Sequence, residues 1–358
     1  MSHYNHKNCK SCDPCIPCAP DTGACCLRKT NYYVEACPTN HRHHKSKNPT
    51  KGKDPVYLFV QDYGPLDAQV ILIPDGLLAP DQFEYQFGPL LDAGFRVVAV
   101  TPRGMGSSDK PECLYSLDVW ADDLNSVIEQ LRLCDFILVG STPLSRISTR
   151  YMTRHGCDKV KGAFFHSPNA FSMVFQAIGP ALKTAMATDR ENTVDDLVSL
   201  FFSPVVITDA TRNWANNRLL QLPIRVWQGL IDSLLEDLRP ELKCVCTCVL
   251  GIVGEFDQFN SIPEAEAFIA GIPDGKLIVV PGAGHSVQIS IPGQTVYNDN
   301  LIAFAKACDP CAYLQNFVPP PLPDPVPGFA PFSAAPGFRR LARWNANGPA
   351  DAQGEPLF

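Results

Sequence analysis

Four cysteines near the start of the chain have a spacing that suits metal binding. They recur at every third residue, with prolines between them that prevent a regular helix: Cys9, Cys12, Cys15 and Cys18. Repeated Cys-x-x-Cys turns are compatible with a tetrahedral zinc ion or with an iron–sulfur cluster. A flexible segment with adjacent Cys25 and Cys26 also suits disulfides or other cross-links, and unbonded thiols are a third alternative. The sequence therefore leaves zinc in this segment as one of three interpretations.

Other cysteines recur later in the chain. The total of 15 is odd, so at least one thiol is unpaired or is bonded to another chain. Cys244, Cys246 and Cys248 alternate, and a period of two places all three on one face of an extended strand. They fit small apolar core residues at least as well as a site. The sequence Cys-Asp-Pro-Cys occurs at residues 12–15 and 308–311, and we hypothesise that these two turns meet at the end of the last core helix.

The overall composition argues against several classes of partner. A formal net charge of −7 over 358 residues gives no reason to expect binding to nucleic acid or to an anionic membrane. No apolar stretch approaches the roughly 20 residues that cross a bilayer, and the first residues lack the apolar centre of a signal peptide. We therefore expect a soluble protein that is synthesised in the cytosol. Because clustered cysteines rarely form disulfides in a reducing compartment, an oxidising assembled particle is the alternative.

Composition divides the chain into three regions. Residues 1–54 form an arm that is rich in cysteine and histidine and cannot bury a core of its own, so its order requires cross-links, a metal or a partner surface. Residues 55–312 carry the pattern of a globular domain. Residues 313–358 form a tail that contains a stiff, proline-rich run at 318–327. This tail is either disordered or an arm that docks its aromatic residues on a neighbouring surface.

Short apolar runs alternate with helical patterns through the middle region. The runs predict buried strands, and they lie at 70–73, 95–100, 136–139, 162–165, 249–253 and 277–280. A clear amphipathic helix lies between them, with apolar residues from Trp120 to Leu131 on one face. Such alternation predicts an α/β fold with a mostly parallel sheet that helices cover on both faces. Residues 170–240 interrupt the alternation, and we expect them to form a helical lid over the carboxyl ends of the strands.

Five local motifs follow one another in a characteristic order. They are Ile73-Pro74-Asp75-Gly76, Arg103-Gly104-Met105-Gly106-Ser107-Ser108-Asp109-Lys110-Pro111, Leu138-Val139-Gly140-Ser141-Thr142, Gly254-Glu255-Phe256-Asp257 and Pro281-Gly282-Ala283-Gly284-His285. Each alone is weak, but all five in this order over about 250 residues resemble the α/β-hydrolase superfamily. The chain resembles a divergent member, because most members have His-Gly where it has Asp75-Gly76. The resemblance implies the α/β-hydrolase fold.

The resemblance also assigns roles to individual residues. It places Thr142 at the nucleophile position, Asp257 as the acid, His285 as the histidine, and Leu77 beside the turn that supplies one oxyanion-hole amide. The nucleophile elbow differs from the family pattern in three successive residues. Thr142 is β-branched where a positive φ is expected, Pro143 lacks the N–H that should meet the oxyanion, and Leu144 replaces a glycine. Taking Ser141 as the nucleophile does not restore the flanking glycines.

These changes lead to two hypotheses of different kinds. The first is a catalytically silent or altered α/β-hydrolase fold, in which the Cys-rich and Pro-rich extensions contact copies of the chain or an assembly partner. The second is an active enzyme: a hydrolase of ester-like substrates that uses Thr142, or a cofactor-free lyase or oxygenase that uses the Asp257–His285 dyad. The sequence suggests no cofactor for the core, and a small-molecule ligand fits either hypothesis. The first hypothesis is favoured because Pro143 deletes an oxyanion donor, which typically costs about 100- to 1000-fold in rate.

Overall fold

A computed structural model describes residues 29–36, 55–205, 207–290 and 293–321. The metal or disulfide interpretation of Cys9, Cys12, Cys15 and Cys18 falls outside these residues, as does most of the proline-rich tail. The same holds for the hypothesis that the two Cys-Asp-Pro-Cys turns meet, because residues 12–15 are not described.

The described strands form one eight-stranded sheet, with the order β1-β2-β4-β3-β5-β6-β7-β8. β1 and β2 pair antiparallel to each other, β2 pairs antiparallel to β4, and all the other pairs are parallel. The strands are β1 (Lys29–Ala36), β2 (Val56–Tyr63), β3 (Val70–Pro74), β4 (Arg96–Val100), β5 (Phe136–Ser141), β6 (Val160–His166), β7 (Val249–Gly254) and β8 (Gly275–Val280). All six predicted strands are therefore confirmed, and the mostly parallel α/β fold with them.

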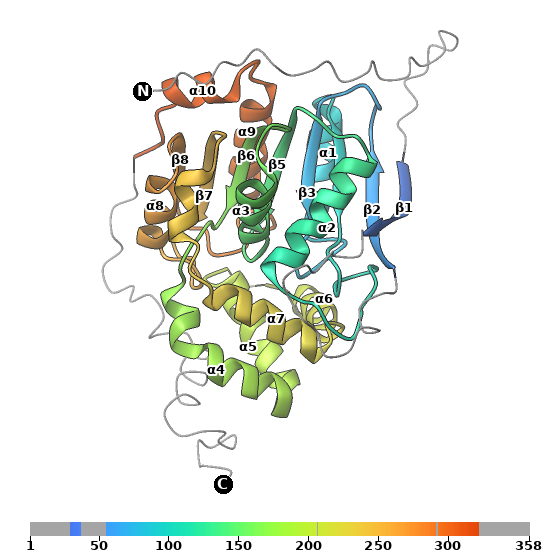
Figure 1. Ribbon diagram of the computed structural model, residues 1–358. Helices are drawn as coiled ribbons and strands as arrows, with labels where there is room; N and C mark the ends of the chain where they lie inside the picture. Colours follow the sequence, from blue (N-terminus) through green and yellow to red (C-terminus); the bar gives the residue numbers. More distant parts are fainter. Residues whose placement is uncertain (1–28, 37–54, 206, 291–292, 322–358) are drawn as a thin grey trace.

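Helices cover both faces of the sheet, which explains why its central strands are buried along their whole length (Figure 1). One face packs against α2 (Leu117–Gln130), α3 (Leu144–His155) and α8 (Ile262–Ala270). The other packs against α1 (Glu84–Asp92), α9 (Gly293–Lys306) and α10 (Pro310–Asn316). The amphipathic segment that begins near Trp120 is α2, with Trp120 itself buried.

Strand β1 extends the sheet beyond the expected domain boundary. It lies within residues 1–54, for which the sequence predicted no packed structure without a cross-link, a metal or a partner. All eight of its residues pair with β2, in a register that runs from Lys29 opposite Tyr63 to Ala36 opposite Val56. Val34 and Ala36 are buried against the core. The boundary at residue 54 is therefore corrected: β1 is ordered because β2 offers its open edge as a partner.

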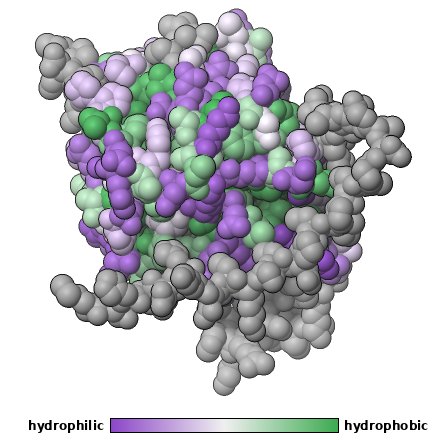
Figure 2. Space-filling view, turned by 90° about the horizontal axis from the view of Figure 1, so that it is seen from above, coloured by the Kyte–Doolittle hydropathy of each residue, from purple (hydrophilic) through white to green (hydrophobic). Residues whose placement is uncertain are grey.

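Four helices form a lid at the carboxyl ends of the strands, in the lower part of Figure 1. They are α4 (Met173–Thr188), α5 (Arg190–Phe202), α6 (Asp209–Leu220) and α7 (Ile224–Leu235), followed by a 3₁₀ helix at Arg239–Cys244. On the surface at the end of the molecule away from the lid, polar and apolar residues are intermingled (Figure 2). Helices α4 to α7 lie within residues 170–240, the segment for which the sequence predicted a helical lid.

A buried arginine attaches the lid to the core. Arg146 of α3 is fully buried, and its guanidinium donates to the carbonyl oxygens of Ser233 and Glu236, at the end of α7. It also donates to the side-chain oxygen of Asn169 at 2.9 Å, just beyond β6. Burial lowers the pKa of Arg146 to about 10, so the side chain stays charged at neutral pH. These bonds fix the position of α7 above the strand ends.

Two disulfides join distant parts of the described chain, Cys157–Cys246 and Cys248–Cys311. Cys244, Cys246 and Cys248 lie just before β7, which begins at Val249, but they do not share one face: Cys244 and Cys246 are exposed and Cys248 is buried. Cys244 ends the 3₁₀ helix and is an exposed free thiol. Cys246 bonds to Cys157, just after α3, and Cys248 bonds to Cys311 within α10. The interpretation as apolar core residues holds for Cys248, which is fully buried, and is wrong for Cys244 and Cys246.

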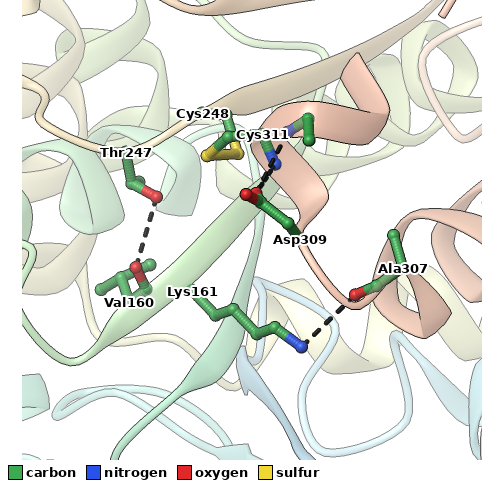
Figure 3. The surroundings of a disulfide bond; sticks show 8 residues. Val160, Lys161, Thr247, Cys248, Ala307, Asp309 and Cys311 are labelled. Carbon is green, nitrogen blue, oxygen red and sulfur yellow. Dashed lines mark hydrogen bonds between the residues drawn. A yellow bond between two sulfur atoms is a disulfide. The ribbon is translucent and has the colours of Figure 1, made fainter. Parts of the chain in front are cut away.

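The second Cys-Asp-Pro-Cys sequence has a structural explanation. Asp309 caps α10: its carboxylate accepts from the N–H groups of Cys311 at 2.9 Å and Ala312 at 3.1 Å. Pro310 occupies the first helical turn, where no N–H is needed. Figure 3 shows how this cap holds Cys311 beside Cys248. The motif here is a helix start that presents one cysteine for a disulfide.

We predict that the disulfides contribute measurably to stability. They close loops of 89 and 63 residues, for which the loss of one cross-link costs about 2–4 kcal/mol. Replacing Cys248 by Ser together with Cys311→Ser should therefore lower the free energy of unfolding in urea by that amount. Cys244→Ser, which removes an exposed free thiol, is the matched control. Equal urea midpoints for the double variant and the unmodified protein would contradict the prediction.

Candidate active site

The expected acid and histidine meet at the carboxyl ends of the sheet. Asp257 follows β7 and His285 follows β8, and both side chains are buried. His285 Nδ1 lies 3.0 Å from Oδ1 and 2.9 Å from Oδ2 of Asp257. Because an ionised carboxylate only accepts hydrogen bonds, Nδ1 is assigned as the donor and carries the proton. The lone pair of the neutral ring is then on Nε2.

Several further donors hold the Asp257 carboxylate. The Ser167 hydroxyl donates to Oδ2 at 2.6 Å, and the N–H groups of Phe259 and Asn260 donate to Oδ1 at 2.8 and 3.0 Å. Burial by itself raises the pKa of this carboxyl, but the charge and hydrogen bonds of its partners outweigh burial and hold the pKa below its usual value. Asp257 is therefore ionised at neutral pH and fixes the orientation of His285.

Aromatic rings enclose the His285 imidazole. The ring centroids of Phe201 and Phe259 lie 5.3 and 5.0 Å from that of His285. Phe201 comes from lid helix α5, so the lid contacts the histidine directly. No described residue makes a hydrogen bond to Nε2 of His285, and the ring lines two adjoining cavities. The arrangement leaves a base that is shielded by apolar rings and open to a ligand.

The elbow differs from the sequence-based expectation in its backbone. The described non-glycine residues with positive φ are Leu114, Arg132, Asp135 and Ser167. Thr142 is not among them, so its β-branch is not placed in the left-handed region. Its hydroxyl donates to the carbonyl oxygen of Ser167 and lies 3.1 Å from the Ser145 hydroxyl. Thr142 shares both cavities with His285, but the hydroxyl proton is already used by the main chain.

The residues around Thr142 also have structural roles. A side chain at Gly140 would place Cβ 2.9 Å from Cα of Ser145, so glycine allows the start of α3 to approach β5 closely. Leu144 is fully buried in the core and not in the path of a substrate. Ser141 faces a different histidine: its hydroxyl oxygen lies 3.1 Å from Nδ1 of His166. The alternative of Ser141 as nucleophile gains no bond to His285.

His166 was not foreseen from the sequence. It ends β6, is fully buried, and burial lowers its pKa to about 3, so the ring is neutral. Its ring centroid lies 5.7 Å from that of His285. A histidine that follows an apolar run has no distinguishing local pattern, so only the packing of β5 against β6 identifies its partner.

The turn after β3 carries the expected oxyanion residue, Leu77, which lines both cavities. Asp75, in the same turn, is buried, and its Oδ1 accepts from the N–H of Gly76 at 2.7 Å. Within the described part of the chain its Oδ2 has no partner. Burial raises the pKa of Asp75 to about 7. The family's usual histidine is thus replaced by a carboxyl that is partly protonated at neutral pH.

Two cavities adjoin at Thr142 and His285. The larger lies under the lid and is apolar, with walls formed by Leu182, Leu197, Trp227, Leu230, Ile231 and Leu234. The smaller is more polar and is bounded by Gln82, Ser141, Ser286 and Gln288. Of these wall residues only Ser141 was considered from the sequence, as an alternative nucleophile. The lid residues were not predicted, because lid packing decides which of their side chains face inward.

The described residues were expected to contain neither a metal site in the core nor a membrane-spanning helix. Among the described residues, no group of three or more His, Cys, Asp or Glu side chains could hold a metal ion. The proposed zinc ligands, from Cys9 to Cys18, are not part of the described chain. The search for a membrane-spanning helix over the same residues found none that is long and apolar enough.

Comparisons with known proteins extend over most of the domain. Residues 70–298 match the sequence model of the alpha/beta hydrolase family. The AB hydrolase superfamily protein YisY of Bacillus subtilis is 33% identical over 249 residues, which are 66% of this chain and 91% of that protein. The bifunctional esterase/perhydrolase DCH of Acinetobacter calcoaceticus is 28% identical over 274 residues, covering 71% of this chain and 98% of that protein.

Solved structures agree in fold. A bromoperoxidase from Bacillus anthracis superposes with a TM-score of 0.67 at 20% identity, covering 78% of this chain and 100% of that chain. An esterase from Exiguobacterium antarcticum gives a TM-score of 0.66 at 23% identity, covering 77% and 99%. At these identities the likeness concerns the fold alone.

The hypothesis of a catalytically silent binding or structural module is wrong. The relatives that match over nearly their whole length are named as enzymes, among them the esterase/perhydrolase and a non-heme chloroperoxidase of Kitasatospora aureofaciens. The error arose because the altered elbow was taken to indicate loss of catalysis. Pro143 removes one donor, whereas the acid–histidine pair and the cavity beside it are complete.

We predict a pH-dependent gain in stability when Asp75 is replaced by Asn. The pKa of this carboxyl is higher in the folded protein than in the unfolded chain, so its contribution to stability is full below about pH 4 and is lost as the pH rises to about 7. Between pH 4 and pH 8 the difference in unfolding free energy between the variant and the unmodified protein should change by about 2–4 kcal/mol in favour of the variant. Urea unfolding across this range measures the effect.

The control for this prediction is Asp67→Asn, which removes the same charge at an exposed position. Parallel stability curves for the Asp75 variant and the unmodified protein from pH 4 to 8 would contradict the assignment of a neutral, buried carboxyl.

Proposed function

This chain belongs to the α/β-hydrolase family, and we propose that it is an active hydrolase of ester-like substrates with an apolar acyl group. The observation that carries the proposal is the buried Asp257–His285 pair, in which the histidine lines both cavities. The names of the relatives, which include an esterase/perhydrolase, support the same reaction class.

His285 is proposed as the general base. Asp257 accepts the Nδ1 proton, which keeps the lone pair on Nε2 and stabilises the imidazolium that forms when a proton is taken up. The aromatic rings of Phe201 and Phe259 restrict the imidazole to this orientation. A positioned base of this kind typically contributes about 100- to 10,000-fold to a rate.

We propose that the attacking oxygen comes from water rather than from Thr142. The Thr142 hydroxyl donates to the main chain at Ser167, and its backbone does not adopt the left-handed conformation of a nucleophile elbow. His285 removes a proton from a bound water, and the resulting hydroxide forms a bond to the ester carbonyl carbon. The tetrahedral intermediate then breaks its bond to the alcohol oxygen, which takes the proton back from His285. The products are a carboxylic acid and an alcohol.

The larger cavity supports an apolar acyl group as the preferred substrate part. Its walls come mainly from lid helices α4, α5 and α7, and their side chains are aliphatic or aromatic. Transfer of an acyl chain from water into such a cavity is favourable by about 0.8 kcal/mol per methylene group. Longer acyl chains should therefore bind more tightly until the cavity is filled.

A second candidate activity is perhydrolysis, in which hydrogen peroxide takes the place of water. The names of two relatives favour it, an esterase/perhydrolase and a non-heme chloroperoxidase. The peroxide oxygen would attack the ester carbonyl as water does, and the products would be a peracid and an alcohol. No metal is required, because His285 supplies the base.

We predict that catalysis depends on His285 far more than on Thr142. With short-chain aryl esters, His285→Gln should lower kcat by at least about 100-fold. Thr142→Val, which keeps the shape but removes the hydroxyl, should retain activity within about tenfold, and a fluorophosphonate probe should leave the unmodified protein unlabelled. Labelling that disappears in Thr142→Val would show that threonine is the nucleophile. Full activity in His285→Gln would refute the dyad mechanism.

A separate measurement tests the second candidate. If water and peroxide use the same base, adding hydrogen peroxide to an ester reaction should yield peracid, and His285→Gln should abolish its formation together with hydrolysis. Hydrolysis without detectable peracid would restrict the protein to the first activity.

A further inference from the structure

The proposed reaction creates a negatively charged oxygen that needs two donors, and one of the usual two is missing. The N–H of Leu77 remains available after the β3 turn, whereas the residue after Thr142 is a proline and has no N–H. Loss of one such donor typically costs about 100- to 1000-fold in rate. The inference below rests on the proposed hydrolase function and concerns the group that replaces this donor.

Gln82 is the side chain best placed to be that group. It lies between β3 and α1, is 7% exposed, and lines the smaller cavity together with Thr142 and His285. Its Oε1 accepts from the N–H of Leu78 at 3.3 Å. Because that partner is a donor, the oxygen of the amide must face it, and the NH₂ group must face the other way. No described residue makes a hydrogen bond to Nε2.

The turn after β3 is shaped around this amide. A Cβ at Gly76 would lie 1.6 Å from Oε1 and 2.5 Å from Nε2 of Gln82. Any other residue at position 76 would therefore expel the amide from the turn. Gly76 thus has a specific role, which is to let a side-chain amide lie against the main chain that carries the Leu77 N–H.

We infer that Gln82 Nε2 donates to the oxyanion, in partnership with the N–H of Leu77. The Gln82 amide oxygen accepts from the main chain at Leu78, the residue next to Leu77, and both Gln82 and Leu77 line the smaller cavity. Two adjacent donors on one wall can converge on a single oxygen, which is what an oxyanion hole requires. The amide is neutral, so it donates without adding a titration to the pH profile.

Other polar groups of the smaller cavity fit this role less well. The Ser141 hydroxyl is paired with His166, and the Thr142 hydroxyl donates to Ser167. Gln288 and Ser286 follow His285 along the chain and do not bond the β3 turn. Gln82 alone among these side chains is hydrogen-bonded next to Leu77.

Kinetic constants for Gln82 variants test the inference. Gln82→Leu removes the donor with little change in volume, and Gln82→Glu keeps the shape but replaces the NH₂ group by an acceptor. Both should lower kcat for an aryl ester by about 100-fold or more while KM changes less than threefold. The matched control is Gln315→Glu, an equivalent change at an exposed site on α10, which should leave both constants unchanged.

The outcomes separate this inference from the hydrolase proposal. Activity within threefold of the unmodified protein in Gln82→Leu, with activity abolished in His285→Gln, would overturn the donor role and leave the hydrolase intact. An equal loss of kcat in Gln288→Leu would also overturn it, because the general polarity of the cavity would then explain both effects. Should the Gln82 variants fail to fold, Gly76→Ala, which displaces the amide, must lower kcat similarly, and unchanged kcat there would refute the inference.

Discussion

The buried carboxylate of Asp257 is the group on which the rest of the site depends. A buried charge costs several kcal/mol unless its oxygens are fully paired. Here they accept from His285, from the Ser167 hydroxyl, and from the N–H groups of Phe259 and Asn260. These partners follow β6, β7 and β8, so satisfying one carboxylate fixes the ends of three adjacent strands. The orientation of His285, the proposed general base, is a consequence of that requirement.

The altered elbow is consistent with a site in which the base survives and the nucleophile is replaced. The Ser167 hydroxyl donates a hydrogen bond to Asp257, and the carbonyl oxygen of the same residue accepts a hydrogen bond from the Thr142 hydroxyl. Ser167 therefore couples Asp257 to Thr142, the residue at the expected nucleophile position. Gly140 persists because α3 must approach β5 closely, which is a packing requirement that does not depend on catalysis.

The lid encloses the site, and a disulfide at the other end of the sheet holds the strand that leads to Asp257. Arg146 links α3 to the end of α7, and Phe201 brings α5 into contact with His285. The lid thus supplies both the apolar cavity and part of the shell around the base. At the other end of the sheet, Cys248–Cys311 ties the start of β7 to α10. The strand that presents Asp257 is consequently held at its beginning by a covalent bond and at its end by hydrogen bonds.

The sequence by itself determined the α/β-hydrolase fold, the lid, and the positions of Asp257 and His285, because strand periodicity and turn motifs are local properties of the chain. It led to the wrong hypothesis of a catalytically silent protein, since a missing amide is visible locally while the replacement donor that we propose, Gln82, is not. The direction of the Thr142 hydroxyl and the pairing of Cys246 and Cys248 were likewise decided only by tertiary structure. Each depends on a partner tens of residues away, or on the path of the backbone around it. Contacts of that kind exist only after the sheet has assembled.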